Sequence, residues 1–138
     1  MKKLRANIEF KNPDQIISMG GPWVGELYFD KLKVSDNVIL DNIIQDEIKD
    51  RLYFIKYNLN GSGKREYYFS INFLDVHAKD VYMFDMKFNK VYIKHLSNED
   101  SLTFYRAFHD SIEKFRDVLN LNSLDMILLK SLNEESNK

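Results

Sequence analysis

The sequence predicts an α+β domain in which an antiparallel β-meander of about five to seven strands packs against one long and one short C-terminal helix. Three observations support this prediction. The segment Arg51–Leu96 holds eleven of the nineteen aromatic residues, in a run that mostly alternates at strand spacing. Beyond residue 100, apolar residues recur at intervals of three and four, as on one face of a helix. The 138 residues suit one domain, which we place at 1–132 with a frayed tail at 133–138.

Two strands are expected before residue 30. The first is predicted from the alternation of polar residues with Leu4, Ala6, Ile8 and Phe10. It should end before Pro13, and the second should begin near Trp23, after the glycine and proline residues at 20–22. Residues 11–22 are otherwise left irregular. Val38–Leu40 suits a short strand, whereas Asn42–Lys49 suits either a helical turn or a loop.

Two hairpins are expected in the middle of the chain. Leu52–Tyr57 and Tyr67–Leu74 flank the turn formers Asn60–Gly63. Val81–Phe84 and Lys90–Lys94 form a second pair of the same kind. Four consecutive antiparallel strands would make a meander.

The long helix is predicted to begin at Ser97–Asp100, where serine, asparagine and two carboxylates suit a helix N-terminus. Its apolar face would consist of Tyr105, Phe108, Ile112, Phe115 and Leu119. A short second helix would start at Ser123 and bury Leu124, Ile127, Leu128 and Leu132. Both are expected to cover one face of the sheet.

The composition of the chain excludes several kinds of chemistry and several kinds of partner. The chain has no cysteine, which excludes disulfides, thiolate metal sites and thiol nucleophiles. Its formal net charge of −1 provides no overall attraction to nucleic acid or to an acidic membrane. No apolar run approaches the roughly 20 residues of a membrane-spanning helix, and the N-terminal residues do not form a secretory signal. We therefore expect a soluble, cytoplasmic protein without a cofactor and without membrane contact.

Local charge suggests two binding surfaces. Arg51–Leu96 has eight basic and four acidic residues. Tyrosines and lysines fall on polar registers of its strands, which suggests a docking face for a macromolecule; these residues are Tyr53, Tyr57, Tyr68, Tyr92, Lys90 and Lys94. A second, acidic surface would comprise Asp41, Asp46, Glu47 and Asp50. The same tyrosines are nearly as well explained as a shield for the sheet backbone, and acidic runs are usually only solvated.

These patterns favour a small, non-catalytic protein-binding module, of which a bacterial immunity or inhibitor protein that blocks a toxin is one version. A first alternative is a single-stranded nucleic-acid-binding domain that uses the tyrosine and lysine face. A second is a metal-dependent hydrolase with Asp75, His77 and Asp80 converging. The segment Gly61–Lys64 is not a phosphate-binding loop, because the earlier glycine and the following hydroxyl residue are missing. The exposed sheet face and the oligomeric state are left open.

Overall fold

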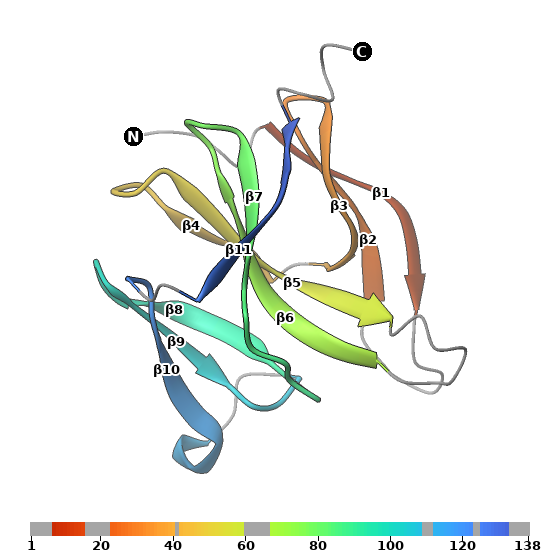
Figure 1. Cartoon of the computed structure of the whole chain (residues 1–138). Helices are drawn as coiled ribbons and strands as arrows, with labels where there is room; N and C mark the ends of the chain where they lie inside the picture. Colours follow the sequence, from red (N-terminus) through yellow and green to blue (C-terminus); the bar gives the residue numbers. More distant parts are fainter. Residues whose placement is uncertain are drawn as a thin grey trace.

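The computed structural model describes residues 7–15, 23–40, 42–59, 67–108, 112–122 and 125–132, and the chain in these ranges is nearly all β (Figure 1). The predicted α+β class is therefore wrong. No helix of seven or more residues occurs in the described ranges. Within the same ranges, no helix is long and apolar enough to cross a membrane. The tail at 133–138 lies outside the described residues.

Eight strands form one antiparallel sheet. They are β1 (Ile8–Gln15), β2 (Trp23–Phe29), β3 (Leu32–Ile39), β4 (Ile44–Asp46), β5 (Arg51–Leu59), β6 (Tyr67–Asp75), β7 (Asp80–Phe84) and β11 (Met126–Ser131). The order across the sheet is β1-β2-β3-β5-β6-β7-β11, and β4 pairs with the first residues of β5. One register pair, Val38 with Lys56, joins β3 to β5. Most residues of β3 therefore have no register partner on β5.

A second, three-stranded antiparallel sheet has the order β10-β9-β8. Its strands are β8 (Tyr92–Asn98), β9 (Ser101–Tyr105) and β10 (Arg116–Asn120), with the 3-10 turn η2 (Glu113–Phe115) before β10. Figure 1 shows this sheet below and to the left of β5 and β6. The predicted pairing of Val81–Phe84 with Lys90–Lys94 is wrong, because β7 pairs with β6 and β11 while β8 belongs to the other sheet.

Strands β5 and β6 are buried on both faces, which explains their almost continuous apolar sequence. Tyr53 and Ile55 face a cluster shared with the small sheet, and Leu52 and Phe54 face a second cluster within the large sheet. All four side chains have a relative exposure of 0%. The hairpin predicted at 52–57 and 67–74 is confirmed, with full antiparallel register from Arg51 onward. Its turn lies outside the described residues.

The predicted long helix is instead a turn, β9, η2 and β10. Leu102 and Phe104 are fully buried and alternate with Thr103, which is the period of a strand. Asn98 Oδ1 accepts the backbone N–H of Asp100 at 2.8 Å and closes the turn between β8 and β9. The side chain that suggested a helix N-terminus thus stabilises a local turn, a role open to the same residue types.

The predicted short C-terminal helix is strand β11. It pairs antiparallel with β7, from Met126 opposite Phe84 to Ser131 opposite Asp80. A run of apolar residues this short is compatible with either a helix or a strand. The segment is a strand because it pairs with β7. At the other end of the chain, β1 continues through Pro13 to Gln15, beyond the predicted stop. The strand predicted from Trp23 is confirmed as β2.

Candidate functional site

The predicted tyrosine face is not a single surface. Tyr53 is fully buried, and Tyr57 packs against the cluster between the two sheets. Tyr68 lies opposite Asn58, one residue from the Tyr57–Phe69 pair, so it faces the other side of the large sheet. Tyr92 belongs to the small sheet. The nucleic-acid alternative therefore loses the continuous aromatic surface on which it rested.

The two predicted lysines also lie apart. Lys90 is exposed, with its Nζ 5.7 Å from the Phe108 ring centroid. Lys94 is half-buried in β8. Tyr68 instead has Lys87 Nζ at 4.8 Å from its ring centroid. Aromatic and basic side chains therefore meet in separate pairs rather than along one groove.

The predicted acidic surface is only partly a surface. Asp46 is 2% exposed, and its Oδ1 accepts the backbone N–H groups of Ile48 and Lys49 at 2.9 and 3.1 Å. It therefore holds the turn after β4 rather than facing a partner. Glu47 is exposed and Asp50 is half-buried. Asp41 lies outside the described residues.

The hydrolase alternative places Asp75, His77 and Asp80 at one turn. Asp75 and Asp80 are register partners at the ends of β6 and β7, and His77 is exposed between them. Asp75 Oδ1 accepts the backbone N–H groups of His77 and Ala78 at 3.1 and 3.0 Å, so this carboxylate closes the turn. The part of the chain that the structure describes contains no group of three or more residues arranged to hold a metal ion.

Among the described residues, five strands have an edge that pairs with no other strand, and β4, with three residues, is the shortest of them. Three others have a feature that hinders pairing with another chain. Strand β1 carries Pro13 and a bulge between Lys11 and Asp14. On β8, the buried Asn42 side chain accepts the N–H of Ile93 and donates to its carbonyl, at 3.1 and 2.9 Å. Strand β10 is five residues long, and Asp117 is ion-paired with Arg106 at 2.9 Å.

The remaining edge strand, β11, is apolar. Ile127, Leu128 and Leu129 are consecutive and have relative exposures of 41%, 56% and 44%. The strand pairs with β7 on one side and ends the sheet on the other. A bulge between Leu128 and Lys130 is its one irregularity. Exposed apolar side chains on a strand edge are a typical site for strand addition.

A cavity of about 160 Å³ lies beside this edge, between β11 and β3, and we call it the β3–β11 slot. Its lining residues are Val34, Ser35, Asp36, Lys56, Val81, Leu129 and Lys130. Three strands separate β3 from β11 in the sheet order, so the sheet must curve to bring both to one cavity. The slot is several times the ~30 Å³ that one water molecule occupies in the liquid.

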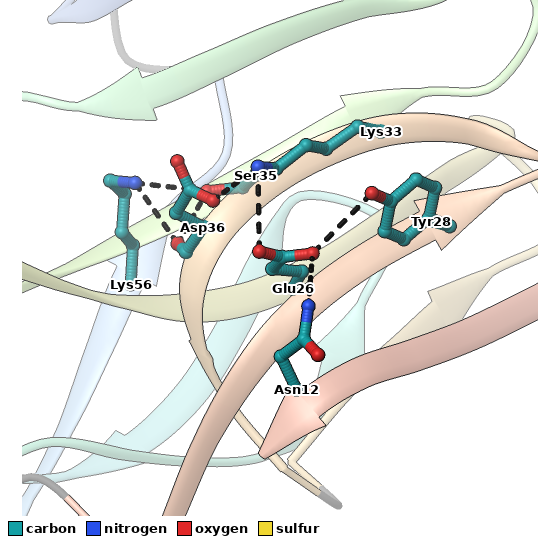
Figure 2. Close-up of polar contacts among 7 residues, drawn as sticks. All are labelled: Asn12, Glu26, Tyr28, Lys33, Ser35, Asp36 and Lys56. Carbon is teal, nitrogen blue, oxygen red and sulfur yellow. Dashed lines mark hydrogen bonds and ion pairs between the residues drawn. The ribbon is translucent and has the colours of Figure 1, made fainter. Parts of the chain in front are cut away.

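Lys56 lines the slot from β5, and its side chain points toward Ser35 and Asp36 on β3 (Figure 2). Its Nζ donates to Ser35 Oγ at 3.1 Å and to the backbone carbonyl of Asp36 at 3.0 Å. Burial lowers the pKa of Lys56, and nearby Lys130 and Lys33 lower it further, while the Asp36 charge acts in the opposite direction. Among the described residues, no carboxylate lies within ion-pair distance of Lys56 Nζ.

The carboxylate of Asp36 turns to a different lysine. Lys33 Nζ lies 2.5 Å from Asp36 Oδ1 and 3.7 Å from Glu26 Oε2 (Figure 2). The hydrogen bond from Lys33 holds the pKa of Asp36 below its ordinary value. Glu26 Oε1 also accepts a hydrogen bond from Asn12 Nδ2 at 3.1 Å. Asp36 is thus ion-paired with Lys33, whereas Lys56 forms no ion pair among the described residues.

A polar row continues from Lys56 along the same face of the sheet. Asn58 Nδ2 donates to Ser70 Oγ at 2.9 Å, and Ser70 Oγ donates to Asn72 Oδ1 at 2.7 Å. Asn72 is fully buried, and its Nδ2 has no hydrogen-bond partner in the structure. The floor of the curved sheet is therefore polar beside the slot and apolar at Phe54 and Leu74.

Sequence reasoning missed both parts of this site. Two of the three apolar residues, Ile127 and Leu128, belong to the apolar face of the predicted short helix, which the structure replaces by the strand β11. Lys56 stood within an aromatic strand, where alternation gave no sign that Ser35 and Asp36 would approach it. Comparison of the chain with protein-family models, curated proteins and solved structures gives no match.

Proposed function

We propose that this chain is a non-catalytic protein-binding module that captures an extended segment of a partner protein along the free edge of β11. The observation that supports it is the contrast among the edge strands of the described chain. Strand β4 has only three residues, and β1, β8 and β10 carry a proline, a side chain that occupies the edge, or an ion pair. Strand β11 instead exposes three consecutive apolar residues, Ile127, Leu128 and Leu129. An added strand would bond to the edge backbone, and its alternate side chains would pack on the exposed leucines.

A protein strand suits this edge better than a second copy of β11. The adjacent slot is lined by Lys56, whereas the strand Met126–Ser131 contains a lysine and no acidic residue. A partner segment that carries a carboxylate complements this charge. An immunity protein that blocks a toxin is one version of such a module.

Cross-linking from β11 tests the proposal. Because the chain has no cysteine, single-cysteine variants Leu128→Cys and Val118→Cys can each carry one photo-reactive label. Val118 is the matched control, since it is 49% exposed on the edge strand β10. In an extract of the native host, the label at residue 128 should attach to one defined segment of one protein, and the label at 118 should not.

The cross-linked segment is then synthesised, and its dissociation constant is measured with purified protein. Leu128→Lys should weaken binding by about tenfold or more, equivalent to ~1.4 kcal/mol, and Val118→Lys should leave it unchanged. Equal affinity of the wild type and Leu128→Lys contradicts the proposal. So does a label that joins only two copies of this chain, because it would assign the edge to self-association.

A further inference from the structure

The β3–β11 slot contains an ammonium group, that of Lys56, which forms no ion pair among the described residues. Two hydrogen bonds of Lys56 Nζ go to the neutral acceptors Ser35 Oγ and the Asp36 carbonyl. An ammonium group has three donors, and no further acceptor of Lys56 is present among the described residues. A half-buried charge without an opposite charge is unfavourable, and an anion placed beside it offsets the lost hydration.

The slot has room for such an anion. Lys56 lines it, and the acidic lining residue, Asp36, is already paired with Lys33 at 2.5 Å. Val34, Val81 and Leu129 form its apolar walls, which strengthen an ion pair by excluding water. The cavity of about 160 Å³ admits a carboxylate together with its carbon stem.

We infer that the β3–β11 slot receives one carboxylate group, supplied by an acidic side chain of the segment that docks along β11. Leu129 and Lys130 belong both to this edge strand and to the slot lining, so an added strand passes beside the opening. The source of the carboxylate rests on the proposed function, whereas the carboxylate site itself does not. A free small carboxylate is the other source of the same chemistry.

Acetate tests the site without any partner. In protein with ¹³C-labelled lysine, sodium acetate titrated at constant ionic strength against sodium chloride should shift the Lys56 ε-carbon signal in a saturable way. The signal of Lys90, an exposed lysine that does not line the slot, should follow ionic strength alone. Lys56→Met should remove the saturable response from the Ser35 and Asp36 amides, and Lys90→Met should preserve it. Absence of a saturable response in the wild type overturns the site.

The cross-linked segment then identifies the source. Replacing its acidic residue by the matching amide should weaken binding to the wild type about tenfold, as expected for a charge-assisted hydrogen bond. The same replacement should have little effect on binding to Lys56→Met. If acetate binds but the amide replacement weakens binding to the wild type and to Lys56→Met equally, the carboxylate does not come from the docked segment. The slot would then be assigned to a free small carboxylate. Failure of the proposed function is seen separately, as equal affinity of the wild type and Leu128→Lys.

Discussion

Asn42 shows how one side chain replaces a neighbouring strand. It is 6% exposed, and its amide makes both hydrogen bonds that a paired strand would make to Ile93. Asn42→Ala would leave a buried N–H and a buried carbonyl without partners, so we expect a loss of about 2–4 kcal/mol in the free energy of unfolding. Urea denaturation measures this loss.

The control for that experiment is Asn120→Ala. Asn120 is exposed, and its Oδ1 accepts one backbone N–H, that of Asn122, at 2.9 Å. Its substitution should cost less than about 1 kcal/mol, because water can replace the lost bond. Equal losses for the two variants would show that the bridge from Asn42 to β8 contributes no special stability.

The pKa values of Lys56 and Lys33 are expected to be shifted in opposite directions. Burial lowers the pKa of Lys56, while the hydrogen bond to Asp36 raises the pKa of Lys33 above the ordinary value of 10.5. Nuclear magnetic resonance of the lysine ε-carbons should therefore give a lower midpoint for Lys56 than for Lys33. A Lys56 midpoint at or above that of Lys33 is incompatible with the described slot.

The same shift has a consequence for stability. Between the lowered pKa of Lys56 and 10.5, the unfolded chain binds more protons at this residue than the folded chain does. The Lys56 contribution to the free energy of unfolding must therefore rise with pH across that window. The buried Tyr53, whose pKa is raised by burial, opposes this trend at high pH. We expect the stability difference between wild type and Lys56→Met to increase in favour of the wild type as pH rises, measured by urea denaturation.

At the scale of the element, β9 gives the clearest contrast between helix and strand. Phe104 is fully buried, whereas its neighbour Tyr105 is partly exposed. We expect Phe104→Ala to cost about 3–5 kcal/mol through the lost contacts and the cavity, and Tyr105→Ala to cost much less. The helix predicted from sequence would bury Tyr105 instead. A larger loss for Tyr105→Ala in thermal unfolding would support that helix and contradict β9.

The strands that could be predicted from sequence are those with an uninterrupted local pattern. β2, β5 and β6 are rich in aromatic and branched residues over seven to nine positions. The helix prediction failed because Tyr105, Phe108 and Leu119 recur at helical spacing only by combining β9, a loop and β10. Two-residue alternation within five-residue strands is too short to outweigh such a coincidence. Whether a short segment forms a helix or a strand depends on the strands that it can pair with, and these lie far away in the sequence.

At the scale of the whole molecule, the two apolar clusters share β5 and β6. One cluster joins the small sheet to the large one, and the other fills the curve of the large sheet. This arrangement brings β11 and β3 to the same slot, although residues 35 and 130 are far apart in the chain. The candidate site could not be predicted from sequence, because it depends on this curvature. The aromatic hairpin of β5 and β6 was predicted correctly, but most of its aromatic side chains lie in the core rather than on a docking face.

Hydrogen–deuterium exchange of the complex with the cross-linked partner segment tests the central claim most directly. If the segment adds a strand to β11, the amides of Met126–Ser131 on the free edge will exchange more slowly in the complex, while those of β1 and β10 will be unchanged. Slower exchange at β1 or β10 with none at β11 would contradict the account.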